Sequence, residues 1–463
     1  MPSAATTSVR ILIGALTVII GVTYKNYRDL SAPGKRPDLD SNEYWGPKLQ
    51  GSYKENKAVL PYDISVAPEL IADLKTQLDR PLKLQEPLEG VGFEYGFNAN
   101  ELQKVVKYWR ESYLTKWNEH EQFLKKFKHF QTEIQGLKIH FIHVKPVKAE
   151  GKKVLPLLLL HGWPGSVREF YELLPLLTTG NDKSDYVFEV IAPSLPGYGW
   201  SQSASRPGFG AAQVSVVMRN LMLRLGFNKF LIQGGDWGSI IGSNLAALFP
   251  DNVLGYHSNM CGNSSPLANI RMLLSSFLPS FYIDSQYAHF YKGLGHLFKN
   301  LIMEEMGYAH IQATKPDTIG SALAHNPVGL AAYIFEKFST WTNEEYKSLP
   351  DGGLTKRFSY DQLLDNIMVY YVTNSITTSV RLYAETMNST QMGLNLESVH
   401  IHAPVGCARF LHELAHTPDS VLANKYRNLV HSTHYNEGGH FPAFEVPQQL
   451  YEDFASFVKK AFA

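Results

Sequence analysis

The sequence has little cysteine and no net charge. Only Cys261 and Cys407 occur among 463 residues, which argues against a framework of disulfide bonds and fits a reducing compartment. The 43 basic side chains balance the 43 acidic ones, so the chain has no electrostatic footprint for nucleic acid. Internal repeats and low-complexity tracts are also absent. We therefore expect no nucleic-acid partner and no small domain held together by disulfides.

A recognisable metal motif is missing as well, although the chain has 17 histidines. It contains neither an H-E-x-x-H string nor a cysteine cluster. The pairs His400 with His402 and His431 with His434 could be imagined as ligands. His400 and His402, however, fall on one side of a predicted strand, where a packing role is simpler. We predict no metal ion.

The N-terminus contains a nearly unbroken apolar run at residues 11–24, followed by the basic residues Lys25 and Arg28. If residues 8–24 all contribute, the run approaches the ~17–25 residues of a membrane span. A cleaved signal peptide is the main alternative, but no convincing cleavage site follows the run. We expect residues 1–30 to be a membrane anchor in contact with lipid. Because positive charge is heavier after the run than before it, the following domain should be cytoplasmic.

Residues 31–150 are expected to form an N-terminal extension and a first hairpin. A stretch rich in Pro, Gly, Lys and Asp at residues 31–59 is typical of a linker. Apolar residues at helical spacing predict an amphipathic helix over 100–117. Alternating residues at 130–133 and 137–144 predict the two strands of the hairpin.

Strands and helices then alternate through residues 151–260, the first part of the predicted core. The run 155–160 is continuously apolar, as a buried parallel strand should be. Further strands are predicted at 187–193 and 230–233, and helices at 214–225 and 239–249. This rhythm predicts an α/β fold with a doubly wound sheet.

The rhythm stops in residues 261–390, which are helical and rich in aromatic side chains. An inserted helical cap is the natural interpretation of this segment. Residues 391–463 are expected to be the second part of the core, with a strand at 399–403 and a closing helix at 447–462.

The most informative string is Gly234-Gly235-Asp236-Trp237-Gly238-Ser239. It lies between a predicted strand and a predicted helix, as a nucleophile elbow does, but it carries aspartate where most elbows carry serine. A carboxylate is already ionised at neutral pH and suits attack at saturated carbon. Such attack leaves an ester on the enzyme, and water must then cleave it. That second step needs a base.

His440 in Gly438-Gly439-His440-Phe441-Pro442 is the candidate base, because the order in α/β-hydrolases is nucleophile, acid, histidine. The acid should follow a strand between Asp236 and His440. Glu413 and Asp419 both satisfy that condition, and the residues alone do not separate them. Ester cleavage also needs two donors for an oxyanion.

The loop His161-Gly162-Trp163-Pro164-Gly165 follows the strand 155–160 and could supply one such donor, the amide of Trp163. The amide of Trp237 is the other candidate. An ordinary Pro-Gly turn is the alternative for this loop. The glycine-rich segment 194–201 is interpreted as a structural turn near the pocket.

Together these strings resemble the epoxide hydrolases of the α/β-hydrolase superfamily. The anchor-like N-terminus, the long segment before the core and the strings at 307–312 and 337–342 are similar to the microsomal branch, nearest to the insect juvenile hormone epoxide hydrolases. The resemblance implies an α/β-hydrolase core with an inserted helical cap, and a microsomal membrane location in the endoplasmic reticulum. It implies five catalytic residues: nucleophile Asp236, base His440, acid Glu413 and the proton-donating cap tyrosines Tyr308 and Tyr383.

We therefore expect hydrolysis of epoxides on apolar substrates to vicinal diols, through a covalent aspartyl ester and without a cofactor. Juvenile hormone is the substrate that the resemblance suggests, and a general xenobiotic epoxide hydrolase is the alternative. A haloalkane dehalogenase would also use an aspartate elbow, but it would need halide-binding donors in place of the tyrosine pair. A non-catalytic carrier of an apolar ligand is disfavoured by the intact set Asp236, Glu413 and His440.

Overall fold

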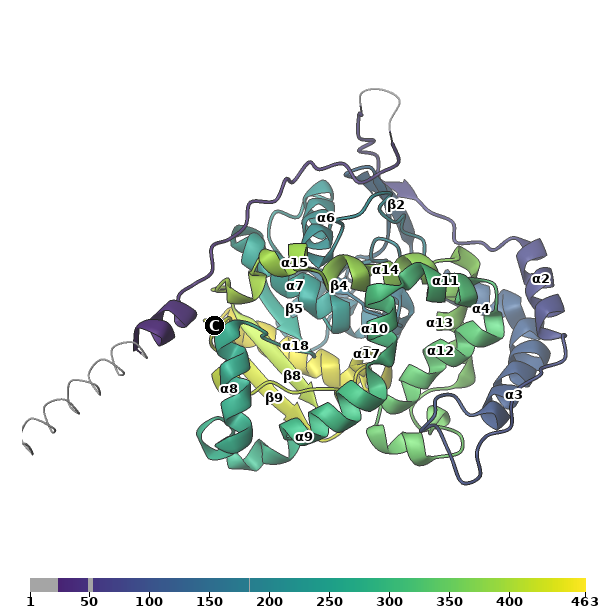
Figure 1. The fold of residues 1–463 in the computed structure, drawn as a ribbon. Coiled ribbons are helices and arrows are strands. Elements are labelled where there is room, and N and C mark those ends of the chain that lie inside the picture. The colour runs from purple at the N-terminus through teal and green to yellow at the C-terminus, as the bar shows by residue number, and fades with distance from the viewer. Residues whose placement is uncertain (1–23, 49–52, 183) are drawn as a thin grey trace, which may run out of the picture.

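The computed structural model describes residues 24–48, 53–182 and 184–463. Within these residues one sheet of nine strands forms the centre of the molecule, in the order β1-β2-β3-β5-β4-β6-β7-β8-β9 (Figure 1). The strands are β1 (Leu60–Pro61), β2 (His129–Ile134), β3 (Leu137–Val144), β4 (Lys153–Leu160), β5 (Tyr186–Pro193), β6 (Phe230–Gly234), β7 (Val253–Ser258), β8 (Val405–Phe410) and β9 (Leu429–Tyr435). Pairing is antiparallel from β1 through β3 to β5 and parallel from β5 to β9.

The sequence pattern accounts for the strands on which the site is built. All five residues of β6 and the last four of β4 are buried, as expected for parallel strands covered on both faces. The predicted hairpin is confirmed as β2 and β3, joined at Gln135 and Gly136. Both residues have positive φ, which a two-residue hairpin turn requires.

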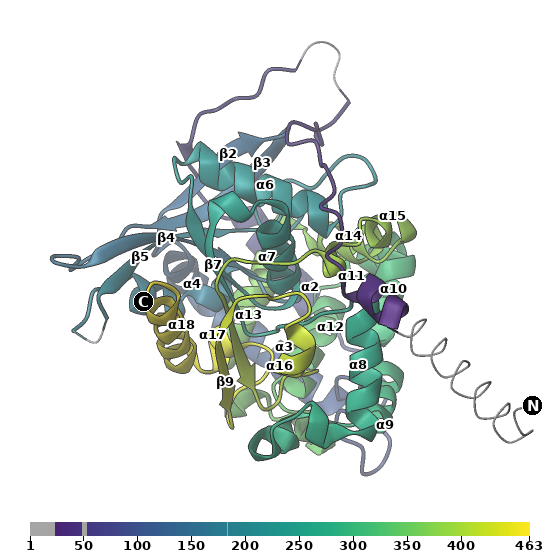
Figure 2. The ribbon, with the colours of Figure 1, turned by 90° about the vertical axis from the view of Figure 1, so that its left-hand side faces the viewer.

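Helices cover both faces of the sheet (Figures 1 and 2). One face packs against α6 (Ala211–Arg224) and α7 (Asp236–Leu248), and the other against α5 (Leu173–Thr178) and α18 (Pro447–Ala461). The short helix α17 (Pro442–Glu445) lies just before α18. The predicted doubly wound sheet is therefore confirmed.

A helical insertion separates β7 from β8. Its helices are α8 (Pro266–Phe277), α9 (Leu294–His296), η7 (Leu297–Glu305), α10 (Gly307–Thr314), α11 (Pro316–Ala324), α12 (Pro327–Thr340), α13 (Tyr360–Thr373), α14 (Ile376–Thr386) and α15 (Ser389–Gly393), with single 3-10 turns η5 (Pro279–Phe281), η6 (Ser285–Phe290), η8 (Glu344–Ser348), η9 (Leu354–Lys356) and η10 (Leu396–Ser398) between them. The insertion lies where a helical cap is predicted.

The N-terminal extension crosses the molecule from beside α8 to the far side of the insertion (Figure 1). There α2 (Pro68–Leu78) and α3 (Ala99–Tyr108) pack against α12. The single helix predicted over 100–117 is instead α3, then a π-helical turn η1 (Trp109–Tyr113) and a 3-10 turn η2 (Leu114–Lys116), before α4 (Trp117–Leu124). Trp109 and Tyr113 are fully buried, which confirms that the apolar side of the predicted helix faces the core. The hydrogen-bond pattern, however, changes from α-helical to π-helical and then to 3-10.

The strand predicted at 399–403 is wrong. Only Ile401 makes an isolated bridge there, and the strand that joins the sheet is β8, after Pro404. Apolar residues alternate with His400 and His402 in the predicted segment, which imitates a strand. The alignment with β7 begins only at Val405, whose side chain is completely buried.

Cys261 and Cys407 form a disulfide bond, which the argument from cysteine scarcity missed. The two residues are 146 positions apart, and only the pairing of β7 with β8 brings their segments together. The bond also removes the support for a reducing compartment. The predicted anchor, for its part, lies almost wholly in residues 1–23, outside the described residues. In the part of the chain that the structure describes, no helix has the length and apolar character needed to cross a membrane.

Candidate active site

Asp236 stands at the sharp turn between β6 and α7. Its φ is +48°, a left-handed conformation that side chains other than glycine rarely adopt. Small neighbours make room for the turn: a Cβ on Gly238 would come within 2.1 Å of the Leu160 carbonyl oxygen. One on Gly162 would come within 2.2 Å of the Asp236 carboxylate. The predicted elbow is therefore present, with its aspartate held clear of the backbone.

The Asp236 carboxylate has a donor on one side and an imidazole on the other. The Trp163 amide N–H donates to Asp236 Oδ1 at 2.8 Å, and His440 Nε2 lies 3.3 Å from Oδ2. Trp237 follows Asp236 in the first turn of α7, where backbone N–H groups have no partner within the helix. The Trp163 amide therefore contacts Asp236, and the Trp237 amide follows Asp236 directly in the chain.

His440 joins Asp236 to a second carboxylate. Its Nδ1 lies 2.6 Å from Glu413 Oε1, and both side chains are buried. Burial by itself would lower the pKa of His440, but the carboxylates of Glu413 and Asp236 outweigh it and raise that pKa well above 6.5. The imidazole is therefore a cation while both carboxylates are charged.

The structure separates the two candidate acids. Asp419 bonds instead to the guanidinium of Arg409 at 2.5 Å and to the hydroxyl of Ser432 at 3.1 Å. Glu413 lies three residues beyond the end of β8, as the predicted order of nucleophile, acid and histidine requires. Geometry thus places Glu413, and not Asp419, beside His440.

Tyr308 of α10 and Tyr383 of α14 contact each other and pack against Trp163 and Trp237, the two tryptophans beside Asp236. The Tyr308 ring stacks on Trp163 with centroids 5.2 Å apart, and the Tyr383 ring stands edge-on to Trp237 at 4.7 Å. The two tyrosine rings are 5.8 Å apart. Burial raises the pKa of both phenols far above 10. The charge of Asp236 raises the pKa of Tyr308 further, and Tyr308 and Asp236 do the same for Tyr383. Both phenols therefore keep their protons and can donate them in hydrogen bonds.

Two buried carboxyl groups near His440 were missed by the sequence reasoning. Glu169 lines a cavity of about 20 Å³ together with Asp236 and His440, which is room for about one water molecule. Glu445 accepts hydrogen bonds from the amides of Gly439 and Phe441, one on each side of His440. Burial raises the pKa of each carboxyl to about 8. Neither residue belongs to a motif, so only the fold reveals it.

Helix α13 holds the loop that carries the Trp163 amide. Asn366 Nδ2 donates to the Pro164 carbonyl at 2.9 Å, and the Tyr370 hydroxyl donates to the Gly165 carbonyl at 2.7 Å. The Ser166 hydroxyl in turn donates to Asn366 Oδ1 at 2.8 Å. These three bonds join consecutive loop residues to one helix of the insertion.

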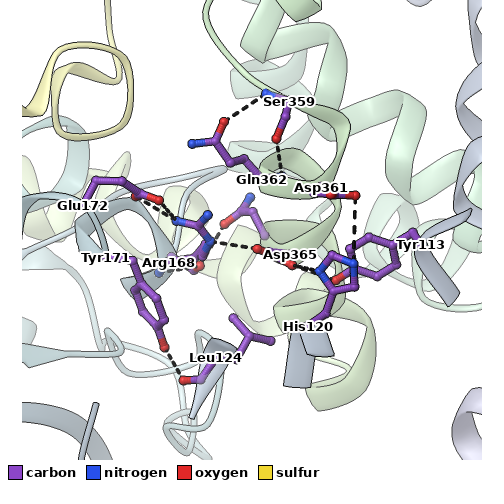
Figure 3. A network of polar contacts seen from close by, with 12 residues as sticks. Tyr113, His120, Leu124, Arg168, Tyr171, Glu172, Ser359, Asp361, Gln362 and Asp365 are labelled. Carbon is purple, nitrogen blue, oxygen red and sulfur yellow. Dashed lines mark hydrogen bonds and ion pairs between the residues drawn. The ribbon is translucent and has the colours of Figure 1, made fainter. Parts of the chain in front are cut away.

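A buried ion-pair network extends the same connection to the N-terminal extension (Figure 3). Arg168 Nε donates to Asp365 Oδ2 of α13 at 3.1 Å, and its Nη1 pairs with Glu172 at 2.9 Å. The other oxygen of Asp365 accepts from the Tyr113 hydroxyl at 2.9 Å and contacts His120 Nδ1 at 3.1 Å. Core, insertion and extension therefore share one polar cluster behind the loop.

Comparison with known proteins agrees with this geometry. The family model described as "Epoxide hydrolase N terminus" matches residues 59–170, and the model described as "alpha/beta hydrolase fold" matches residues 156–381. Juvenile hormone epoxide hydrolase 1 of Ctenocephalides felis is 47% identical over 97% of this chain and 95% of its own length. Epoxide hydrolase 1 of Sus scrofa is 43% identical over 90% of this chain and 92% of its own.

A solved structure is similar over most of the chain. The crystal structure of juvenile hormone epoxide hydrolase from the silkworm Bombyx mori has a TM-score of 0.89 and 44% identity, covering 92% of this chain and 99% of that one. Fold and site thus define a hydrolase of the α/β-hydrolase class. Within that class the chain belongs to the epoxide hydrolases, the family of these relatives, and it hydrolyses epoxides to diols.

Proposed function

We propose that the reaction runs through a covalent ester on Asp236. The observation that carries this proposal is the position of the Asp236 carboxylate between the Trp163 amide and the His440 imidazole. A carboxylate oxygen attacks one epoxide carbon, and the bond from that carbon to the ring oxygen breaks. The released alkoxide takes a proton from Tyr308 or Tyr383, whose phenols are protonated and whose rings pack against Trp163 and Trp237 beside the aspartate.

The second half of the reaction uses His440. Ester formation removes the charge of Asp236, one of the two carboxylates that raise the pKa of the imidazole. The pKa of His440 then falls, and the proton that it loses restores the tyrosine phenol that protonated the alkoxide. The neutral His440 takes a proton from water while Glu413 orients it. Attack of that water on the ester carbonyl gives an oxyanion, which accepts hydrogen bonds from the amides of Trp163 and Trp237. Collapse of this intermediate breaks the bond from the carboxyl carbon to the diol oxygen, which takes the proton from His440. The Asp236 carboxyl then returns its own proton to His440, and the resting state is restored.

The helical insertion acts as the cap in this proposal, since it supplies both tyrosines. We propose an apolar epoxide as substrate, with juvenile hormone as the specific one, because the relatives from Ctenocephalides felis and Bombyx mori are named for it. A general role in the hydrolysis of foreign epoxides is the alternative, because Epoxide hydrolase 1 of Sus scrofa, at 43% identity, is not named for juvenile hormone. Comparing kcat/KM for juvenile hormone and for styrene oxide decides between them.

We also propose that the chain is anchored in the endoplasmic reticulum membrane by one span through residues 8–24, with the catalytic part in the cytoplasm. The apolar run and the basic residues that follow it support this arrangement. Protease treatment of sealed microsomes checks it. The catalytic part should be digested without detergent, and its protection would contradict the orientation.

One turnover in oxygen-18 water, with enzyme in excess, tests the covalent step. The first diol should be unlabelled because its new oxygen comes from Asp236, and label should enter Asp236 instead. A fully labelled first diol would mean that water attacks the epoxide directly. Asp236→Ala should lower turnover by roughly 10³-fold or more, whereas His440→Gln should let the ester accumulate, as mass spectrometry of the intact chain can show.

A further inference from the structure

Helices α8 and η7 expose an unusual number of large apolar side chains. We call this the α8–η7 surface, and its members are Ile270, Leu273, Leu274, Phe277, Leu278, Phe281, Leu294, Phe298, Ile302 and Met303. Phe277 is 73% exposed and Phe281 79%. Large apolar side chains exposed in such number mark an interaction site in a folded protein.

The pattern in α8 is that of an amphipathic helix turned outward. Its exposed apolar residues recur three and four positions apart, so they share one side of the helix. The other side is attached to the molecule: Leu267 and Ala268 are buried, and Arg271 Nη1 donates to the Ser420 carbonyl at 3.0 Å. Residues 272–283 contain no charged side chain. The outward side of α8 is thus suited to an apolar medium.

The surface lies where the N-terminal segment reaches the folded body. Residues 24–31 are helical and lie beside α8 (Figure 2). Arg271 Nη2 donates to the Tyr27 hydroxyl at 3.0 Å, which fixes this neighbourhood. The apolar run of the sequence, residues 11–24, ends at this same point. Any membrane held by that run is therefore close to α8.

In the chain, the α8–η7 surface directly precedes an element of the active site. Helix η7 carries Phe298 and Ile302 and ends at Glu305, and α10 with Tyr308 starts two residues later. Contact of η7 with lipid would place the bilayer next to the element that holds one of the two tyrosines. An apolar epoxide dissolved in the bilayer would then have a short path to the site.

We propose that the α8–η7 surface docks on the lipid bilayer, with its apolar side chains in the boundary between headgroups and acyl chains. The inference rests on the proposed membrane attachment and gives it a second contact besides the anchor. An amphipathic helix that presents Leu and Phe on its outward face is a usual form of interfacial membrane contact. A second copy of the chain, or residues 1–23, would be other occupants, and the test below distinguishes them from lipid.

Tryptophan fluorescence in vesicles tests the docking directly. Phe281→Trp and Phe298→Trp are each made in the full chain and reconstituted into phosphatidylcholine vesicles with and without brominated acyl chains. Bromine should quench the emission added by each new indole, relative to the background of the seven native tryptophans. Tyr95→Trp is the matched control, since Tyr95 is 82% exposed and comes four residues before α3 in the chain. Helix α3 lies far from α8 (Figure 1).

Quenching at 281 and 298 but not at 95 is the expected result. Absence of quenching at 281 and 298 overturns the proposal, whether a second copy or residues 1–23 cover the surface; crosslinking in the same vesicles tells these two apart. Equal quenching at 95 also overturns it, because contact with lipid would not be specific. Turnover of styrene oxide and extraction by alkaline carbonate report on the activity and the anchor separately, so failure of either is distinguishable from failure of docking.

A second variant connects docking with substrate supply. Phe277→Ser combined with Phe281→Ser should raise the apparent KM several-fold for an apolar epoxide dissolved in the vesicles, while kcat for water-soluble styrene oxide stays unchanged. Tyr95→Ser should change neither value. An unchanged KM for the lipid-dissolved epoxide would contradict the proposed path from the bilayer.

Discussion

Two segments of the molecule have opposite surroundings. The loop of residues 161–170 carries the Trp163 amide, and its residues are buried and bonded to α13. The α8–η7 surface belongs to the same helical insertion as α13 but exposes its apolar side chains. Catalytic donors must be held within a few tenths of an ångström, whereas a surface that contacts a fluid medium needs no fixed partner. The loop of residues 161–170 thus positions a catalytic donor, whereas the α8–η7 surface contacts the surroundings of the protein.

The largest effect should come from breaking the cluster behind the loop. Asp365→Ala leaves Arg168 without its buried carboxylate partner and leaves Tyr113 without its acceptor. Removing one partner of a buried pair costs about 3–5 kcal/mol. We expect the free energy of unfolding to fall by that amount, as measured by urea denaturation.

Asp317→Ala is the matched control for this change. Asp317 pairs with Arg381 in the same insertion, but their side chains are 64% and 45% exposed. An exposed pair of this kind contributes at most about 1 kcal/mol. If Asp365→Ala and Asp317→Ala lowered the free energy of unfolding equally, the buried network would stabilise the protein no more than the exposed pair does.

An intermediate effect is expected from pH, because Glu169 of the loop segment is buried. Burial raises its pKa from 4.5 to about 8, so the folded protein keeps this proton while the unfolded chain loses it above about pH 4.5. The folded pKa exceeds the unfolded one, and stability must therefore fall as pH rises from about 4.5 to 8. Each pKa unit corresponds to about 1.4 kcal/mol, so the loss amounts to several kcal/mol.

Glu169→Gln should remove this contribution, so that the unfolding free energy of the variant depends less on pH than that of the wild type over the same interval. Glu69→Gln changes an exposed carboxyl of α2 and should leave the wild-type dependence in place. A variant with an unchanged slope would show that Glu169 is already ionised in the folded protein.

A contrast between local and long-range features explains how much of the structure could be predicted from the sequence. The elbow was predictable because glycines surround Asp236, His440 and the Trp163 loop. The tight turns and close backbone contacts at these places require glycine, so the requirement is visible in the local sequence. Glu169, Asp365 and their partners are brought together from distant segments and carry no local signal. The disulfide and the true position of β8 were missed for the same reason, since both depend on which strand pairs with β7.

The smallest effect should be found on the α8–η7 surface. Phe277→Ser combined with Phe281→Ser removes side chains that touch little of the described chain, and exposed substitutions usually change stability by at most about 0.5 kcal/mol. Urea denaturation of the full chain in detergent-free buffer should therefore give nearly the wild-type midpoint. Leu267→Ala, on the buried side of α8, should in contrast cost about 2–3 kcal/mol. If the double variant lost as much as Leu267→Ala, the two phenylalanines would be packed against protein rather than free to meet lipid, and the contrast between the two segments would fail.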